Sequence, residues 1–276
     1  MSVDTAVAHP QAQRASIGDL LRAWRRRRSL SQLELALEAD VSSRHVSFLE
    51  TGRARPSREM VLRLAEHLDI PLRERNRLLL AAGYAPLYVE RSLEEPEMAP
   101  IHQALDRFLR AHEPYPAIVI DRHHNLVSAN DALGALVEGV APELLEPPAN
   151  ALRVALHPRG MAPRTVNLPE WSAHLLHRLR REAALTADPE LKSLHDELAA
   201  YPGVCPEPPR EEGAVDDIVV PLRLRAADRE LAFFGTISTF GTPVDITLDE
   251  LVIEAFYPAN AATAAYLLEG IAAAVT

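Results

Sequence analysis

Apolar positions recur at helical spacing through the first third of the chain. Ile17, Leu20, Leu21 and Trp24 fall on one face of a first helix. Four further helices follow and end near Gly83. Their start signals are Ser31 with Glu34 three residues on, which form a capping box, and then Ser42, Ser57 and Pro71. The pattern therefore predicts a bundle of five short helices.

The second and third helices of this bundle are short and close together. Their apolar stripes are Leu33, Ala36 and Leu37 in the second helix and Val46 and Leu49 in the third. Only a short turn, Ala39–Val41, separates the second helix from the N-cap of the third, so the third helix projects at a steep angle. Gly52 ends the third helix. The pattern predicts two helices that cross closely at the small residue Ala36.

The pattern changes after residue 100. Apolar runs predict strands at 117–121 and 126–129 and a hairpin of two strands at 217–225 and 230–240. Helical spacing predicts helices at 130–137, capped by Asn130, at 171–200, at 247–256, capped by Thr247, and at 259–274. This mixture predicts an α+β arrangement in which the later hairpin completes the sheet.

A stretch rich in proline and glutamate separates the two patterns. It covers residues 84–100 and is the predicted linker. A chain of 276 residues has room for two domains. We therefore expect a flexible arm at 1–15, a first domain at 16–83 and a second at 101–276. The expected fold class is mainly α with an α+β second domain.

Charge is distributed unevenly between these domains. The chain carries 29 Lys+Arg and 39 Asp+Glu, a net charge of −10. Residues 1–90 hold 14 of the basic and 11 of the acidic residues, a net +3, which leaves 15 and 28, a net −13, for residues 91–276. The first part includes the block Arg25–Arg28. Because DNA contact depends on a local basic face, the first domain can bind DNA, and we expect the acidic second domain to face away from it.

One stretch of the first domain carries a specific family resemblance. Five separated elements keep their register, and they are Leu30–Ala36, Val41–Ser42, Val46, Leu49–Glu50 and Gly52. In these residues the chain resembles the XRE family, the Cro and phage-repressor type of helix-turn-helix protein, over about residues 16–82. The resemblance implies a five-helix DNA-binding domain that places its third helix in the major groove of double-stranded DNA. It also implies a transcription regulator rather than an enzyme.

The resemblance assigns roles to individual residues. The start of the third helix reaches base edges, where Arg44 suits a bidentate pair with guanine and Phe48 a thymine methyl. Residues beside this helix suit phosphates, which position the protein without specifying sequence. The complete set of expected DNA contacts is Gln32, Ser42, Ser43, Arg44, Ser47, Phe48, Thr51, Arg53, Arg55 and Arg58.

Two further details of the family pattern concern the frame of the domain. In the family, an arginine at the position of Arg25 pairs with the glutamate that here is Glu50, and the pair braces the first helix against the third. The family usually has glycine where this chain has Ser29 and Asp40. We expect both to be turn positions with a positive φ, which aspartate tolerates better than serine.

The second domain starts with a pattern of strand, turn, strand and helix. Its residues Ile118–Asp121, Leu126–Val127, Asn130 and Leu133 resemble the start of a PAS domain. Combined with the first domain and linker, this order is similar to regulators with an MmyB-type ligand-binding domain. The resemblance implies a PAS-like mixed α/β sensor domain with an apolar pocket for a small hydrophobic effector, such as a fatty acid or acyl derivative. The candidate lining residues are Ile118, Ile120, Trp171, Leu175, Leu179, Phe233, Ile237 and Phe240, and for any one of them ordinary core packing is the favoured interpretation.

Other chemistry is weakly indicated. His174 and His177 are spaced i,i+3, and His123 and His124 are adjacent in a turn, but no third and fourth metal ligand follows at a fixed spacing. No signature of a catalytic site or a phosphate-binding loop is present. We therefore expect no metal, and no cofactor other than the hydrophobic ligand. The alternative interpretations are an enzyme targeted to DNA and an antitoxin-like protein-interaction module.

Compartment and assembly follow from simple features. A single cysteine, Cys205, and the lack of an apolar run of about 18 residues predict a cytoplasmic protein without a membrane span. One recognition helix covers only a few base pairs, so we expect a homodimer that reads two half-sites. The candidates for the pairing surface lie in the apolar carboxyl-terminal region and include Leu251, Phe256, Tyr266 and Leu267.

Overall fold

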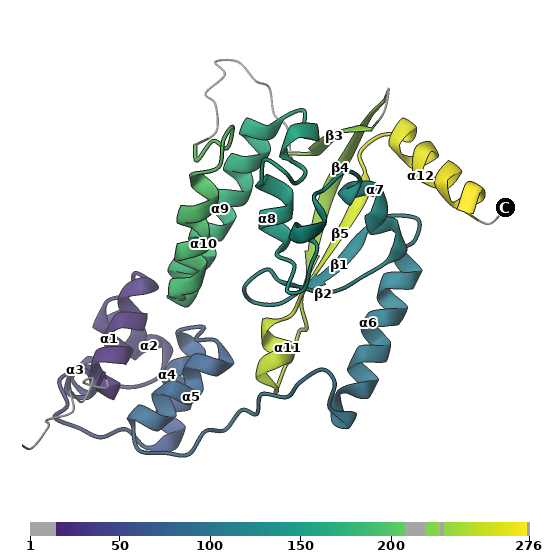
Figure 1. Cartoon of the computed structure of the whole chain (residues 1–276). Helices are drawn as coiled ribbons and strands as arrows, with labels where there is room; N and C mark the ends of the chain where they lie inside the picture. Colours follow the sequence, from purple (N-terminus) through teal and green to yellow (C-terminus); the bar gives the residue numbers. More distant parts are fainter. Residues whose placement is uncertain (1–14, 208–218, 227–228, 275–276) are drawn as a thin grey trace, which may run out of the picture. The chain divides into compact units, whose positions relative to one another are not determined.

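The computed structural model describes residues 15–207, 219–226 and 229–274 (Figure 1). The chain divides into two units, unit 1 (Met1–Val89) and unit 2 (Glu90–Thr276). The division falls inside the expected linker, whose first residues fold onto unit 1. The Asn76 side chain accepts hydrogen bonds from the backbone N–H groups of Leu87 and Tyr88, at 2.8 and 3.1 Å. The expected flexible arm, apart from its last residue, lies outside the described residues.

Unit 1 folds because each short helix has a start signal and an apolar face. Its helices are α1 (Ile17–Arg27), α2 (Gln32–Glu38), α3 (Ser43–Glu50), α4 (Arg58–His67) and α5 (Leu72–Ala81). The three predicted serine N-caps are confirmed, because the hydroxyls of Ser31, Ser42 and Ser57 each accept the backbone N–H three residues on. Trp24, Leu35, Leu49, Leu64 and Leu78 are among the fully buried side chains. The five-helix bundle predicted from the sequence is therefore present.

The predicted apolar stripe of α2 is right for Ala36 and wrong for Leu33 and Leu37. Leu33 and Leu37 are 59% and 72% exposed, whereas Leu35, Ala36 and Ala39 are buried. A helix of two turns carries leucines on more than one face, and helical spacing alone cannot tell which face meets the neighbouring helix. α2 packs on α3 through the face of the two alanines.

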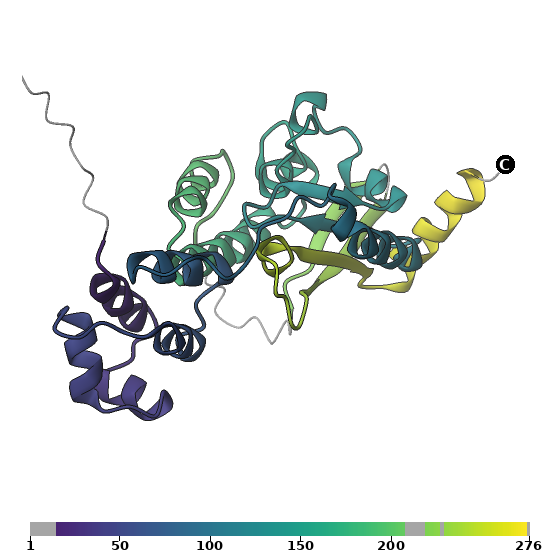
Figure 2. The ribbon, with the colours of Figure 1, turned by 90° about the horizontal axis from the view of Figure 1, so that it is seen from below.

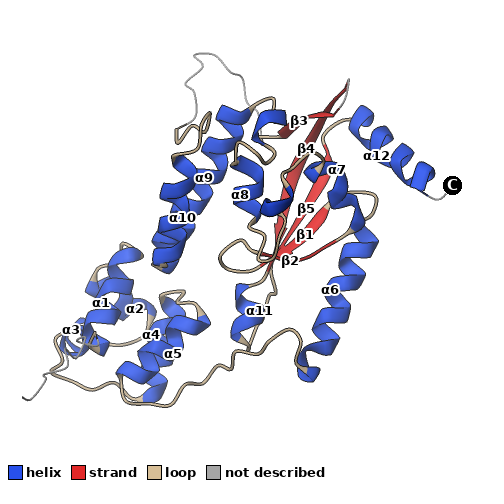
Figure 3. Ribbon diagram, in the orientation of Figure 1, coloured by secondary structure: helices blue, strands red, loops and turns tan. Residues whose placement is uncertain are grey.

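Unit 2 is built on one antiparallel sheet whose strand order differs from chain order. The strands are β1 (Ala117–Ile120), β2 (Leu126–Ala129), β3 (Leu222–Ala226), β4 (Arg229–Ser238) and β5 (Val252–Pro258). They lie in the order β2-β1-β5-β4-β3, so the last strand of the chain is the middle strand (Figure 3). The predicted helix at 247–256 is wrong. Only α11 (Ile246–Glu250) is helical, and its N-cap is Asp245 rather than Thr247. The rest of that segment is β5, because it pairs with strands far away in the sequence.

Alternate residues of the central strands face opposite sides of the sheet. Val119, Ile253 and Ala255 pack with Leu105 and Leu109 of α6 (Ala99–His112), a helix that the sequence analysis missed. The other face carries the main core of unit 2. The helices that contribute to this core are α7 (Gly134–Val137), α8 (Ala151–Leu156), α9 (Leu168–Thr186), α10 (Pro189–Ala199) and, through Leu267, α12 (Ala261–Ala274). Figures 1 and 2 both show α9 and α10 side by side and apart from α6.

Two other predicted helices of unit 2 need correction. The segment 171–200 is two helices, because Ala187 adopts φ 59° and Asp188 caps α10. Asn130 occupies the N-cap position before the helical turn Asp131–Leu133, as predicted, but its side chain makes no capping hydrogen bond there. Its buried side chain instead accepts the Ala117 N–H and donates to the carbonyls of Leu109 and Tyr115. The predicted carboxyl-terminal helix is α12 (Ala261–Ala274).

Candidate DNA-binding face and ligand cavity

The turn between α2 and α3 is fixed by backbone geometry. Ala39 ends α2, Asp40 has φ 52° and Ser42 caps α3. Ser29, between α1 and α2, has φ 57°. The prediction of a positive φ at the two positions where glycine is usual in the family is therefore confirmed. The left-handed conformation turns the chain sharply and sets the direction in which α3 projects.

α3 presents a polar, basic surface outward. Ser43 and Arg44 are exposed, Ser47 and Phe48 are half-buried, and Val46 and Leu49 face the core. The guanidinium carbons of Arg44 and Arg53 lie 5.1 and 5.9 Å from the centre of the Phe48 ring. Cation–π contacts with Phe48 therefore hold both guanidinium groups beside the outer surface of α3.

Residues beside α3 occupy different environments. Ser42, Thr51, Arg53 and Arg55 are exposed, while Arg58 is half-buried and its Nε is buried without a hydrogen-bond partner among the described residues. The Thr51 hydroxyl donates to the Ser47 carbonyl at 2.7 Å. Arg53 and Arg55 are thus the cations of this set whose side chains are most open to a phosphate.

A buried polar cluster holds α1, α2 and α3 together. The Arg25 Nε and Nη2 donate to the two carboxylate oxygens of Glu50 at 2.6 and 2.9 Å, which confirms the predicted pair. Gln32 Nε2 donates to Glu50 Oε2 at 2.8 Å, so this side chain, expected at a phosphate, serves the cluster. Burial by itself would raise the pKa of Glu50, but the hydrogen bonds from Arg25 and Gln32 outweigh it and lower that pKa below its ordinary value.

Gly18 explains why α1 can approach α3 so closely. A Cβ at this position would lie 2.6 Å from the Leu49 carbonyl oxygen and 2.7 Å from that of Glu50. Both contacts are with backbone, which cannot move aside cheaply. A glycine is therefore required where α1 crosses α3.

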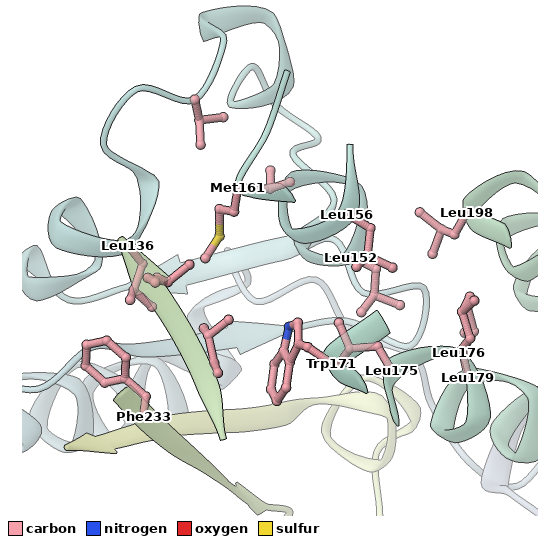
Figure 4. Packing of buried hydrophobic residues seen from close by; sticks show 14 of the residues in the cluster. Leu136, Leu152, Leu156, Met161, Trp171, Leu175, Leu176, Leu179, Leu198 and Phe233 are labelled. Carbon is pink, nitrogen blue, oxygen red and sulfur yellow. The ribbon is translucent and has the colours of Figure 1, made fainter. Parts of the chain in front are cut away.

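Unit 2 contains a cavity between its sheet and the helices α7, α8 and α9. The volume of the cavity that is open to the centre of a water-sized molecule is about 90 Å³. On the same measure one water molecule needs roughly 10–15 Å³, so the cavity has room for a larger molecule. Leu136, Met161 and Trp171 come from three separate segments and surround it (Figure 4). Its walls are Ile118, His124, Leu126, Leu133, Leu136, Val137, Leu145, Ala149, Ala151, Leu152, Val154, Ala155, Met161, Trp171, Leu175, Leu222, Glu254 and Phe256.

The eight candidate lining residues lie in four different environments. Ile118, Trp171 and Leu175 line the cavity. Leu179 and Phe233 are buried in the surrounding core, and Ile120 is buried as well, but none of the three is part of the wall. Ile237 is 52% exposed, and Phe240 packs on the α6 side of the sheet.

Sequence analysis missed most of the cavity wall. α8 and Met161 lie in a short helix and a loop whose periodicity is too brief to recognise, and the helix predicted at 130–137, which contains α7, was not assigned to the cavity. Glu254 and Phe256 were missed because their strand was predicted as a helix. His124 was noticed, but only as one of two adjacent histidines in a turn. A polar residue that interrupts an otherwise apolar run, such as Glu254 within β5, is the signal that sequence reading had available.

Several other predicted features have a local explanation. Of the four residues expected on a pairing surface, Leu251 and Leu267 are buried within unit 2, while Phe256 and Tyr266 are half-buried against its main core. His174 stacks on Trp171, and burial lowers its pKa. Across the described residues, no group of three or more His, Cys, Asp or Glu side chains is placed to hold a metal ion. None of the helices searched in the described part of the chain is long and apolar enough to cross a membrane.

Comparison with known proteins gives two family matches. The family model of the MmyB-like transcription regulator ligand binding domain matches residues 101–269, and a helix-turn-helix model matches residues 21–75. No curated protein sequence is a significant match. A solved RNA-binding light-oxygen-voltage receptor aligns at 14% identity and a TM-score of 0.29, over 94% of this chain and 62% of its own. This chain therefore spans less than two thirds of that receptor, and so distant a likeness carries no argument.

The fold and the two family matches together define the class of protein. The α2–turn–α3 motif in a compact helical unit, joined to a domain with an apolar cavity, is that of a DNA-binding transcription regulator with a ligand-binding domain. The ligand-binding match covers more than half of the 276 residues, and the protein belongs to the family of MmyB-like transcription regulators. The resemblance to helix-turn-helix proteins of the XRE type and the resemblance to regulators with an MmyB-type ligand-binding domain are thus confirmed.

Proposed function

We propose that this protein is a cytoplasmic, ligand-responsive regulator that binds a specific DNA site as a homodimer. In this proposal α3 enters the major groove, Arg44 and Phe48 meet base edges, and Arg53 and Arg55 meet phosphates. A small hydrophobic molecule in the cavity changes the affinity for DNA. The dimer is proposed because one α3 offers too few base contacts for a genomic site.

The observation that carries the ligand half of the proposal is the composition of the cavity wall. Nearly all of its residues are apolar, and only His124 and Glu254 bring ionisable side chains. A water molecule needs two to four polar partners, so a space of this size with this wall suits an apolar molecule better than a water cluster. The class that we propose is a fatty acid or an acyl derivative.

The experiment has two stages. The purified full-length protein is extracted with organic solvent, and the extract is analysed by mass spectrometry. DNA sites selected from random oligonucleotides are then titrated with protein, with and without the extracted compound. We expect an amphiphile in the extract and a change in DNA affinity when it is added back to delipidated protein.

A cavity-filling variant makes the test specific. Ala155 is on the cavity wall, so Ala155→Phe should block the ligand and abolish the response to it while leaving DNA binding itself unchanged. Ala262 is exposed at the start of α12, and Ala262→Phe is the matched control. A ligand response that survives Ala155→Phe would show that the compound acts elsewhere on the protein.

A further inference from the structure

One short segment forms part of the cavity wall with little regular structure of its own. Residues 131–140, which we call the α7 segment, consist of the 3-10 turn Asp131–Leu133, the single helical turn α7 and a turn at Gly139. The segment places Leu133, Leu136 and Val137 on the cavity wall. Its position therefore decides whether this side of the cavity is closed.

The hydrogen bonds that hold the α7 segment in place come from one side chain, Arg164. Its Nη2 donates to the carbonyls of Leu136 at 3.1 Å and Ala135 at 3.5 Å, and its Nη1 donates to the carbonyl of Glu138. Carbonyls at the end of a helix lack partners within the helix, so a cationic donor suits them. Among the described residues, the only other hydrogen bond that leaves the segment goes to the preceding residue, Asn130.

Arg164 is itself anchored to the sheet. Its neighbour Thr165 forms an antiparallel bridge with Leu224 of β3, and the Val166 N–H donates to the Arg223 carbonyl at 2.8 Å. The Arg164 side chain is 22% exposed, and each hydrogen bond that it donates to a described residue goes to the α7 segment. A guanidinium keeps its charge at all ordinary pH values, so this tie is permanent.

The other walls of the cavity are held by several ties each. The strand β1 pairs with β2 on one side and β5 on the other. The helix α8 is capped by Asn150, and its Arg153 donates two hydrogen bonds of 2.8 Å to Glu197 of α10. The helix α9 has 19 residues and packs along α10. Local opening follows the weakest set of contacts, so the α7 segment is the wall that opens at the lowest cost.

Apolar contacts and a turn set how the α7 segment can move. Leu136 and Val140 are 2% and 8% exposed and pack in the main core of unit 2, so they stabilise the closed position together with Arg164. Gly139 adopts φ 73° between them and the next loop, and a Cβ there would meet no atom within 4 Å. A glycine at this position lets the backbone turn without strain and without loss of packing.

We propose that the ligand enters and leaves the cavity past the α7 segment, and that Arg164 is the positioning residue that keeps this segment closed. The inference rests on the proposed ligand-binding function and adds the route to it. Arg164 acts through α7 and makes the same hydrogen bonds whether or not the cavity is filled. It should therefore set the rates of association and dissociation together and leave the dissociation constant, which is their ratio, unchanged.

The first test separates rates from affinity. Binding of 8-bromooctanoate to the delipidated full-length protein is followed by stopped-flow quenching of Trp171 in the cavity wall, while Trp24 is buried in unit 1. Arg164→Met keeps the apolar stem and removes the donors. We expect both rate constants to rise about tenfold, as the loss of one hydrogen bond to a charged group predicts, with an unchanged dissociation constant. Arg181 is exposed on α9, and Arg181→Met is the matched control, which should keep the wild-type rates.

A second test detects opening without a ligand. Leu136→Cys, made in a Cys205→Ser background, places a thiol on the buried side of α7, where it reacts with a water-soluble disulfide reagent only when the segment opens. Arg164→Met should raise this labelling rate about tenfold, and Arg164→Lys, which still donates, should restore part of the protection. Leu176 is 1% exposed in α9, and the labelling rate of Leu176→Cys should not depend on Arg164.

The outcomes separate the inference from the function on which it rests. Binding rates that Arg164→Met does not change, or a loss of affinity without faster association, would overturn the inference and leave the ligand-binding function standing. Equal acceleration of labelling in Leu136→Cys and Leu176→Cys would overturn it as well, because Arg164 would then support unit 2 as a whole. If 8-bromooctanoate does not bind, the proposed function fails for fatty acids, and the route proposed for them fails with it.

Discussion

Glu50 in unit 1 and His124 in unit 2 are buried polar side chains in opposite situations. In unit 1 both carboxylate oxygens of Glu50 are bonded, by Arg25 and Gln32. In unit 2 His124 has one nitrogen bonded and keeps the other without a partner beside a cavity. The completed cluster fixes how α1, α2 and α3 pack, whereas the wall of the cavity in unit 2 includes a side chain with a buried nitrogen that no described residue satisfies. A buried polar side chain therefore stabilises its surroundings only as far as its hydrogen bonds are made.

The largest effect that we expect concerns the completed cluster. Glu50→Ala leaves Arg25 buried without its partner and should lower the free energy of unfolding of unit 1 by about 3–5 kcal/mol. Chemical denaturation followed by Trp24 fluorescence would measure it. Glu38 is exposed at the end of α2, and Glu38→Ala should stay within about 0.5 kcal/mol of wild type. Equal midpoints for the two variants would mean that the cluster does not brace the helices.

The same cluster predicts a pH dependence. The pKa of Glu50 is lower in the folded protein than its ordinary value, so its ionised form stabilises unit 1. This contribution is fully present above the unfolded pKa of about 4.3 and is lost as the pH falls through the folded value. Denaturation midpoints measured from pH 6 downward should fall more steeply for wild type than for Glu50→Gln. Parallel curves would contradict the assignment.

Unit 2 also contains a buried polar side chain, Asn130, whose hydrogen bonds are all made. Asn130→Ala removes one acceptor and two donated hydrogen bonds, and leaves the Ala117 N–H and two carbonyls without that partner. We expect a loss of about 1–3 kcal/mol in the stability of unit 2, with unit 1 unaffected. Thermal unfolding followed by circular dichroism measures it. A large loss in unit 1 as well would show that the two units do not unfold independently.

Two exposed arginines that both lie against Phe48 should have different effects on the DNA binding that we propose for unit 1. Arg44→Ala should relax base preference symmetrically at two positions, at a cost of about 1–3 kcal/mol per half-site. Arg53→Ala should weaken binding to all sequences alike and reduce the slope of log K against log salt by about 1. Selection of oligonucleotides and salt titrations measure the two effects. An Arg44→Ala variant with unchanged sequence preference would remove Arg44 from the reading surface.

The smallest effect concerns the turns of unit 1. Ser29 adopts φ 57°, which a serine reaches at a cost and a glycine does not. Part of that gain is lost to the greater freedom of glycine in the unfolded chain. We expect Ser29→Gly to stabilise unit 1 by about 0.5–1 kcal/mol and to leave DNA affinity unchanged. A destabilised variant would mean that the serine makes a contribution that its backbone angle does not reveal.

The elements of unit 1 could be predicted from the sequence better than those of unit 2, because their signals are local. The start of α2 was readable because Ser31 and Glu34 satisfy the helix end within four residues. β5 was not, because Thr247 and the apolar residues after it also fit a helix, and the strands that hold β5 in place lie far away in the sequence. The Arg25–Glu50 pair could be predicted only through the family resemblance. The unused Nδ1 of His124 could not be predicted at all, because it depends on which side chains fail to reach it.

The place of β5 at the centre of the sheet has a consequence for how the protein is made. On the ribosome, β1 and β2 emerge first and β3 and β4 later, and each pair is only a two-stranded hairpin until β5 arrives between them. Such hairpins are marginal alone. Unit 1, with local helices only, can fold as soon as it leaves the exit tunnel. A nascent chain that stops before Val252 should therefore hold a finished DNA-binding unit and an unfinished sensor, and pulse proteolysis of stalled chains would show the sensor becoming resistant only after β5 has emerged.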